Sequence, residues 1–354
     1  MKHTTKRGLR VAAIAAAGAL ALGGLSACSS GSDTFNVWWY EKDTAMATVW
    51  KAALDELAAA HPNVKIKFEL KTWDQMQKSG AAVLDSDKAP DLTEYNKGNA
   101  TAGVVAAAGL LVDLKDYSAK YGWDKILPAS ALTFGQYNDK GIMGSGNLYG
   151  IASYGEYVSW FYNKDVFDKN GWTVPTSQDE LTALLGKIKA AGQTQCIGGK
   201  DYQNVHMAYA LTLSGADKAW LANFQQLAGP VDWSKWNNAA TTMSDWLAKG
   251  YFPKNVAGIS ADNAVAEFQK GATCPLIMGG TWLDQGMQDK IKFNWDKFKN
   301  PGNMSEGSAG NLLVIPAKSK NKDLAAEFIN LILSKKYQNQ LGELGGLPLA
   351  ADLA

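Results

Sequence analysis

Leu148–Leu181 reads LYGIASYGEYVSWFYNKDVFDKNGWTVPTSQDEL and carries more structural information than any other part of the chain. Its first half, Tyr149–Tyr162, is dense in aromatic and β-branched residues, which favour an extended strand. The chain then turns near Asn163, and Ser177 opens a capping-box pattern typical of a helix start. A long strand that carries a single acid, Glu156, among aromatic residues and leads into new helices is predicted to cross between two lobes.

Upstream of this strand the hydrophobic pattern alternates between two periods. Residues 34–40 form a first predicted strand, and apolar residues at helical spacing predict a helix over 45–59. Residues 64–70 alternate apolar and charged side chains, which indicates a half-buried strand, and a helix around 74–84 and a short strand near 91–95 follow. This β-α-β-α-β order predicts a parallel sheet covered by helices.

The rest of the chain is predicted to be rich in helices. A single helix is expected over 123–132, and several more follow the crossing strand. Strands are expected again near 271–278 and 311–316. Crossings between the lobes are therefore expected near 149–158, 270–278 and 315–318, and the ligand is expected in a cleft at the carboxyl ends of the strands.

Charge and histidine content exclude two classes of function. The 354 residues carry a formal net charge of +1, but four basic residues and no acid lie in the first 27, so the remainder carries −3. A mildly acidic body without basic clusters argues against nucleic-acid binding. The histidines His3, His61 and His206 are scattered, so no histidine-based metal site is expected, and no cofactor is predicted.

The first 27 residues are expected to be an export signal. Basic residues precede a short apolar run, which ends in Leu25-Ser26-Ala27-Cys28 and resembles a bacterial lipobox. That resemblance implies cleavage before Cys28 and lipid attachment to its sulfur, with residues 28–33 as a flexible tether. The expected location is the outer face of the bacterial cytoplasmic membrane.

Two cysteines remain after the lipid-bearing one. Outside the cytoplasm thiols tend to be oxidised, so Cys196 and Cys274 could form one disulfide bond. Sequence alone does not place two Cα atoms within bridging distance, and the pairing stays open at this point.

Two segments carry a resemblance to a known family. Tyr149-Gly150-Ile151, followed by Tyr162-Asn163-Lys164 and the later Gly, Pro and Glu-Leu positions up to Leu181, resembles a segment of family 1 extracellular solute-binding proteins. Phe268–Trp282, with the pattern F-Q-K-G and then M-x-G-x-W, resembles a second segment of that family. These proteins capture carbohydrates for ABC importers, and maltose-binding protein is the best-known relative.

The resemblance implies an α/β, two-lobed, periplasmic-binding-protein-like fold of type II. We expect the first lobe to contain 34–150 and 275–315, and the second to contain 151–274 and 316–354. Members usually continue for several dozen residues beyond the position matched by the last glycines, so the second lobe is expected to be shortened at its C-terminal end.

An enzyme is the rival class of function, and no sequence pattern favours it. The chain has no G-x-S-x-G nucleophile elbow, no phosphate-binding glycine loop and no paired metal-ligand motif. Sugar capture needs planar polar side chains for hydroxyl groups and aromatic rings for pyranose faces. Thirteen tryptophans and thirteen tyrosines supply the rings, and those at strand ends and turns are better candidates than those within helices.

The resemblance and these positions together give a set of candidate ligand contacts. Trp282 is the first candidate, because it comes directly after the Gly279-Gly280 turn region and matches the family's stacking tryptophan. Glu156, on the crossing strand, is the second candidate. The other candidates lie at strand ends, in loops or near the crossing strand: Tyr40, Glu41, Lys42, Trp73, Glu94, Tyr95, Asn96, Asn99, Tyr154, Asp201, Tyr202, Gln203 and Asn311.

The predicted protein is a monomeric, lipid-anchored carbohydrate receptor that traps sugar by hinge closure. Its predicted partners are the membrane permease subunits of an ABC importer, which is powered by a separate ATPase. Three alternatives stay open: the same fold with an amino acid or polyamine as cargo, a surface glycosidase or lectin unconnected to transport, and a sensor that presents its ligand-bound state to a receptor.

Overall fold

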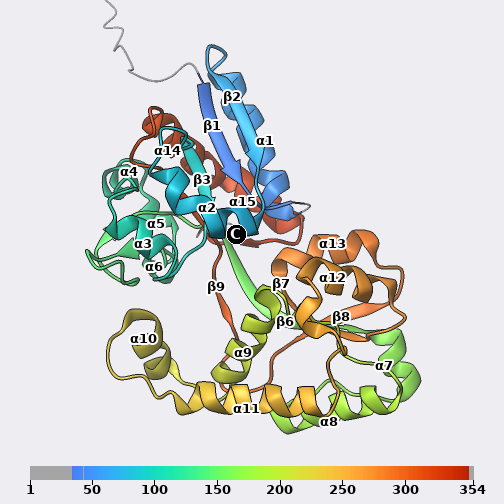
Figure 1. Cartoon of the computed structure of the whole chain (residues 1–354). Helices are drawn as coiled ribbons and strands as arrows, with labels where there is room; N and C mark the ends of the chain where they lie inside the picture. The colour runs from blue at the N-terminus through green and yellow to red at the C-terminus, as the bar shows by residue number, and fades with distance from the viewer. Residues whose placement is uncertain (1–33, 43, 351–354) are drawn as a thin grey trace, which may run out of the picture. The chain divides into compact units, whose positions relative to one another are not determined.

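The computed structural model describes residues 34–42 and 44–350. The predicted export signal, the tether and Cys28 lie outside the described residues. Figure 1 shows the order of the helices and strands along the chain.

The first sheet is built as the sequence predicts. Strand β1 (Thr34–Trp39) pairs in parallel with β2 (Lys65–Leu70) and β3 (Leu92–Tyr95), and β10 (Leu312–Val314) pairs antiparallel with β3. Helix α1 (Ala45–Ala60) follows β1, and α2 (Trp73–Leu84) follows β2. The predicted parallel β-α-β-α-β unit is confirmed.

Local side chains fix the starts of these two helices. Thr44 caps α1 by accepting a hydrogen bond from the Ala47 amide at 3.1 Å. Thr72 and Gln75 form a complete capping box at the start of α2. Each cap satisfies backbone groups that a helix end leaves unpaired, so the strand-to-helix turns are well determined.

The helix expected over 123–132 is two helices in the structure. Helix α5 (Trp123–Ile126) ends before Pro128, and α6 (Ala129–Thr133) begins after it. Leu127 is extended because the proline ring disfavours the helical conformation of the preceding residue. Nearby lie α3 (Ala102–Ala107), α4 (Lys115–Tyr121), and the short hairpin of β4 (Gln136–Tyr137) and β5 (Asn147–Leu148).

The two parts of strand β6 (Tyr154–Asn163) pair with different strands. Its first residues pair antiparallel with β9 (Gly307–Ala309) and β11 (Leu347–Pro348). Its second half pairs with β7 (Leu276–Gly280) and β8 (Trp295–Lys299). The predicted crossing strand is therefore present, and it leads from the first sheet region into a second sheet.

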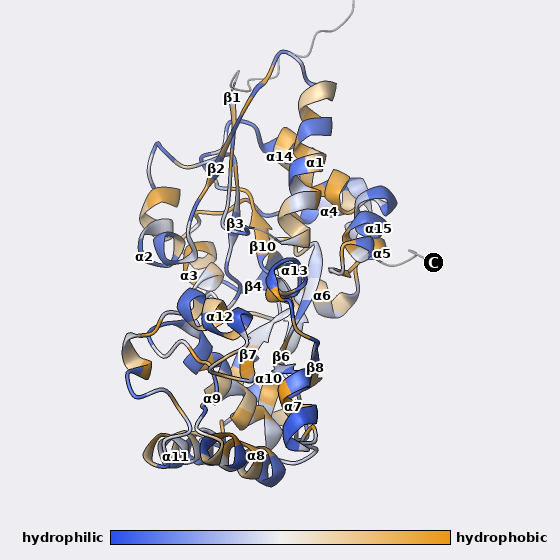
Figure 2. Cartoon of the chain, turned by 90° about the vertical axis from the view of Figure 1, so that its right-hand side faces the viewer, coloured by the Kyte–Doolittle hydropathy of each residue, from blue (hydrophilic) through white to orange (hydrophobic). Residues whose placement is uncertain are grey.

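Helices make up most of the chain between β6 and β8, and η denotes a 3-10 helix. They are α7 (Lys164–Asn170), α8 (Gln178–Ala190), α9 (Tyr202–Ser214), α10 (Lys218–Gln226), α11 (Ser234–Ala248), η1 (Val256–Gly258), α12 (Ala261–Lys270), η2 (Thr281–Leu283) and α13 (Asp284–Lys290). Figure 2 shows that α8 and α11 carry both hydrophilic and hydrophobic residues, as expected for helices with one buried face. Trp160 of β6 and Trp246 of α11 lie in the core that these helices cover.

The expected assignment of two chain segments to the lobes is wrong. Strands β7 and β8 fall within 275–315, which was expected in the first lobe, but both pair with β6 in the second sheet. Helices α14 (Lys322–Ile332) and α15 (Lys335–Glu343) were expected in the second lobe, but their apolar residues Phe328 and Tyr337 lie in the core of the first sheet with Trp50 of α1. Apolar alternation marks a strand but not the sheet that receives it.

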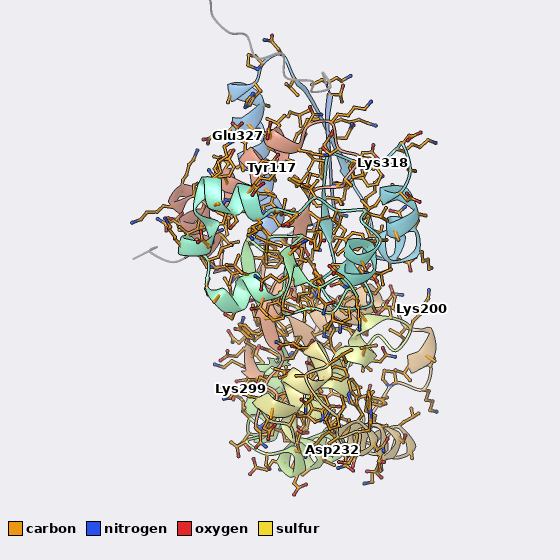
Figure 3. All side chains as sticks on the ribbon, turned by 90° about the vertical axis from the view of Figure 1, so that its left-hand side faces the viewer. Tyr117, Lys200, Asp232, Lys299, Lys318 and Glu327 are labelled. Atoms are coloured by element: carbon orange, nitrogen blue, oxygen red, sulfur yellow. A yellow bond between two sulfur atoms is a disulfide. The ribbon has the colours of Figure 1, made fainter. Side chains whose placement is uncertain are left out.

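Polar contacts also tie α14 to the first lobe. Tyr117 of α4 donates a hydrogen bond to Asp323 at 2.8 Å, and Glu327 lies 2.9 Å from His61 at the end of α1. Figure 3 labels Tyr117 and Glu327 in this part of the molecule. The chain therefore returns to the first sheet between β9 and β10, near 310, rather than at 315–318.

No helix in 34–42 or 44–350 is long and apolar enough to span a membrane.

Candidate functional site

A buried carboxylate, Glu94, connects three strand ends of the first sheet. Its oxygens accept hydrogen bonds from the Tyr40 amide at 2.9 Å and from the Asn311 side chain at 3.1 Å. The Asn311 amide in turn donates to the Tyr154 hydroxyl at 3.1 Å. Glu94 is fully buried, and burial together with the charge of Glu41 raises its pKa well above the usual range. The ends of β1 and β3 and the start of β10 are thus held around one acid.

Two further acids complete what we call the carboxylate cluster, defined as Glu41, Glu94 and Glu156. Burial, with a contribution from the charge of Glu156, raises the pKa of Glu41 to about 7. Glu156, on the crossing strand, forms an ion pair with Lys97, which follows β3. The cluster therefore concentrates acidic side chains at the predicted crossing, with one lysine paired to Glu156.

Glu41→Gln is expected to change how stability depends on pH. A carboxyl whose pKa is raised by folding stabilises the protein most below about 4.5, and this contribution is lost as pH rises towards about 7. Because Glu41 is half-buried, we expect a loss of about 1–2 kcal/mol in the wild type over this range. The groups that face Glu41 are Glu94, Glu156 and Thr44.

Urea unfolding of both proteins between about pH 5 and 8 measures this difference. As pH rises, the free energy of unfolding of the wild type should fall relative to that of E41Q. Parallel curves would show that Glu41 does not titrate in this range.

The second part of the site is an aromatic cluster, defined as Trp73, Tyr202, His206 and Trp282. The ring centroid of Tyr202 lies 6.1 Å from those of Trp73 and Trp282 and 5.7 Å from that of His206. The rings of His206 and Trp282 are 5.5 Å apart. Trp282 packs against the cores of both sheets, so it lies where the two halves of the molecule meet.

The two clusters are close enough to influence each other. Burial raises the pKa of Tyr202 to about 12, although a hydrogen bond with Trp282 acts to lower that pKa. The charge of Glu41 also contributes to the rise. Tyr202 begins α9 and Glu41 follows β1, so the interaction joins elements from the two sheets.

Gly280 allows Trp282 to occupy this position. A Cβ atom on Gly280 would lie 1.9 Å from the Trp282 ring, although the backbone there is ordinary extended chain. Gly280→Ala is therefore expected to move the Trp282 ring and to weaken ligand binding about as much as direct loss of the ring. Tryptophan fluorescence and ligand titration would check this, and unchanged affinity in a folded G280A protein would contradict it.

Three residues that were not among the predicted contacts also lie at the two clusters: Lys97, His206 and Glu306. Nδ1 of His206 lies 2.7 Å from Oε1 of Glu306, and the other carboxylate oxygen of Glu306 is buried without a hydrogen-bond partner among the described residues. Lys97 is 59 positions from its partner Glu156, and His206 is 100 positions from its partner Glu306, so no local sequence pattern predicts these pairs.

Several residues that were predicted to contact the ligand instead pack in the core, bond other parts of the chain or face solvent. Tyr95 is buried against Gly80 of α2. Gln203 is buried and bonds the backbone of Gly198 and Met278. Asp201 accepts from the Ala261 amide at the start of α12, and Asn99 bonds Met143 and Gln225. Lys42 is exposed, and Asn96 is half-buried and accepts from the Ala102 amide through its carbonyl.

The remaining predicted residues are gathered around the two clusters. They are Tyr40, Glu41, Glu94, Glu156, Tyr154, Asn311, Trp73, Tyr202 and Trp282. Tyr154 is buried and its ring faces Trp50, so its part in the site is to hold Asn311. The hydroxyl oxygen of Tyr40 is buried and has no hydrogen-bond partner among the described residues.

Cys196 and Cys274 form a disulfide bond, with Cα atoms 5.5 Å apart. The backbone of Cys196 forms an isolated parallel β-bridge with that of Ile277 in β7. Both cysteine side chains lie in the core with Phe268. The bond joins the segment before α9 to the start of β7, the strand that leads to Trp282.

The arrangement favours binding of a polar molecule that also has an apolar face. Carboxylates accept hydrogen bonds from hydroxyl groups, side-chain amides both accept and donate them, and the rings offer apolar area. In 34–42 and 44–350, no group of three or more histidine, cysteine or acidic side chains is arranged to hold a metal ion.

Comparison with known proteins places the chain among receptors for small solutes. Residues 41–339 match the family described as bacterial extracellular solute-binding protein. A probable sugar-binding periplasmic protein of Mesorhizobium japonicum is 34% identical over 49% of this chain and 40% of its own length. A diacetylchitobiose binding protein of Streptomyces coelicolor is 27% identical over 89% of this chain and 72% of its own length.

Similar solved structures support the fold. A chitin oligosaccharide binding protein superposes with a TM-score of 0.77 at 20% identity, covering 91% of this chain and 82% of that one. The alignments with the Mesorhizobium protein and with a similar Rhizobium meliloti protein span only 40% and 50% of those relatives. The two-lobed periplasmic-binding-protein-like α/β fold is confirmed, and the chain belongs to the bacterial extracellular solute-binding protein family.

Proposed function

We propose that this protein is the carbohydrate-capturing component of an ABC importer. The observation that carries the proposal is the pairing, within a solute-binding fold, of the aromatic cluster around Trp282 with the carboxylate cluster of Glu41, Glu94 and Glu156. Pyranose rings offer apolar faces to aromatic side chains and hydroxyl groups to carboxylates. The names of the relatives, which include sugar-binding and diacetylchitobiose binding proteins, support the same class of ligand.

In this proposal Trp282 stacks on a sugar ring, and Glu156 and Glu41 accept hydrogen bonds from its hydroxyl groups. Tyr40, Trp73, Tyr202, Glu94 and Asn311 complete the contacts or hold them in place. The contacts come from both sheets, so ligand binding favours the conformation in which the two halves approach each other.

The proposal also includes the cellular setting. The family and the named relatives are binding proteins, which supports capture without catalysis. The lipobox-like Leu25–Cys28 supports export and lipid anchoring at Cys28, and delivery to the permease subunits of an importer follows from the proposed function. We propose that the protein acts as a monomer.

Thermal melting of the protein from Ser29 onward against a panel of solutes tests the proposal. The panel contains mono- and oligosaccharides, amino acids and polyamines. A ligand at a hundred times its Kd that binds only the folded state adds about 2.7 kcal/mol of stability and raises the melting temperature by a few degrees. Stabilisation by one class of sugars is expected, and stabilisation by amino acids or polyamines alone would overturn the carbohydrate claim. A chromogenic glycoside that is turned over would instead support the glycosidase alternative.

A further inference from the structure

The site contains more acidic side chains than cationic ones. The carboxylate cluster supplies three acids, and Glu306 adds a fourth beside His206. Lys97 forms an ion pair with Glu156. Nδ1 of His206 lies 2.7 Å from Oε1 of Glu306. Burial makes the ionised forms of Glu41 and Glu94 costly, which is why their pKa values are raised, and a ligand with a positive charge offsets that cost.

Polar atoms left without partners indicate a ligand that donates hydrogen bonds. Oε2 of Glu306 is buried and has no hydrogen-bond partner among the described residues, and the side chain as a whole is 18% exposed. The buried hydroxyl of Tyr40 is likewise unpaired and lies close to Glu41, Glu94 and Glu156. Buried polar atoms are nearly always paired in proteins, so these two atoms, one from each half of the site, indicate where a bound molecule makes contact.

The rings of the aromatic cluster are inclined to one another and do not form a flat platform. The planes of Tyr202 and Trp282 meet at 71°, and those of Tyr202 and Trp73 meet at 61°. The ring plane of His206 lies at 82° to that of Tyr202. Inclined rings present their faces in different directions, and a ring face attracts a cation that lies within about 6 Å of the centroid.

We infer that the sugar captured by this protein carries an ammonium group, so that its preferred ligands are amino sugars rather than neutral or N-acetylated sugars. This inference rests on the proposed function and names the class of sugar. The ammonium group supplies three N–H donors and one positive charge, and hydrogen bonds between charged partners are about twice as strong as neutral ones. It lies between the aromatic cluster and the free carboxylate oxygens, while the remaining hydroxyl groups bind as in any sugar.

Titration calorimetry with matched sugars tests the inference. The ligands are glucosamine, N-acetylglucosamine and glucose, each as the free sugar and as the linked disaccharide. The measurements are made at about pH 7, where an aliphatic amine is largely protonated and Glu41 can ionise when a cation binds. The three sugars share a ring skeleton and differ in the group at one carbon. The amine form is expected to bind at least tenfold more tightly than both neutral forms, and added salt should reduce that preference.

Variants locate the effect. Glu306→Gln and Glu41→Gln should each weaken binding of the amine form several-fold more than they weaken binding of the neutral sugars. Glu267→Gln is the matched control, because Glu267 lies on α12 and pairs with Lys270. It should leave the preference intact. Circular dichroism melting of each variant separates loss of binding from loss of folding.

The outcomes distinguish the inference from the proposed function. Neutral sugars that bind as tightly as the amine, or more tightly, would overturn the inference and leave carbohydrate capture standing. A preference that survives both E306Q and E41Q would also overturn it. No heat of binding with any sugar, from a protein that melts cooperatively, would overturn the proposed function itself.

Discussion

Replacing both Cys196 and Cys274 by serine is expected to lower the free energy of unfolding by about 2–4 kcal/mol. The bond closes a loop with a sequence separation of 78 residues, and long loops lose the most conformational freedom when they are closed in the unfolded chain. Both side chains are almost fully buried, so two serine hydroxyls would also enter an apolar core beside Phe268 and Ile277. This is among the largest stability effects that we expect from any pair of substitutions outside the core aromatic residues.

Urea unfolding of the protein from Ser29 onward, with and without a reductant, measures the effect. This chain lacks Cys28, so Cys196 and Cys274 are its only cysteines. The reductant should lower the unfolding midpoint of the wild type and leave that of the double variant unchanged. Equal midpoints for the oxidised wild type and the double variant would contradict a stabilising role for the bond.

The first sheet could be predicted from the sequence because its signals are local. Alternation over residues 64–70 and helical spacing over 45–59 correspond closely to β2 and α1. The Ser177 cap also forms, since its hydroxyl accepts from the Glu180 amide. The reciprocal half of that capping box does not form, because the Glu180 carboxylate bonds Thr176 instead.

The assignment of later strands to sheets could not be predicted because it depends on partners distant in sequence. Residues 276–280 have a clear strand pattern, but only the tertiary structure shows that they pair with residues 158–162. The same holds for α14 and α15, whose apolar faces could cover either sheet. Their contact with α1 places them in the first lobe.

The candidate site was predictable in part, for reasons of side-chain direction. Glu94 and Tyr95 are adjacent in β3, so their side chains point to opposite faces of the sheet. Glu94 meets Tyr40 and Asn311, whereas Tyr95 packs against α2, and no sequence signal distinguished the two. Trp282 was identifiable because a Gly-Gly turn at a strand end is a local feature with a steric reason, the close approach of its ring to Gly280.

Trp282→Ala is expected to weaken sugar binding by about 1–3 kcal/mol, which is roughly 5- to 150-fold in Kd. The ring contributes apolar area for a pyranose face, and it also supports His206 and Tyr202, whose rings lie 5.5 Å and 6.1 Å away. Removing it therefore eliminates one contact and loosens two others. Trp282→Phe keeps an aromatic face and should retain most of the affinity.

Titration of the preferred sugar against both variants measures this effect, with Trp233→Ala as the control. Trp233 is 58% exposed and lies outside the aromatic cluster, so its loss should leave the affinity unchanged. Because Trp282 packs against the cores of both sheets, the melting temperature of each variant must be recorded alongside its Kd. A W282A protein that melts near the wild type and binds sugar as tightly would remove Trp282 from the site. A loss of affinity in W282A with none in W233A would place the sugar ring where the two sheets meet, because Trp282 contacts both cores and Trp233 does not.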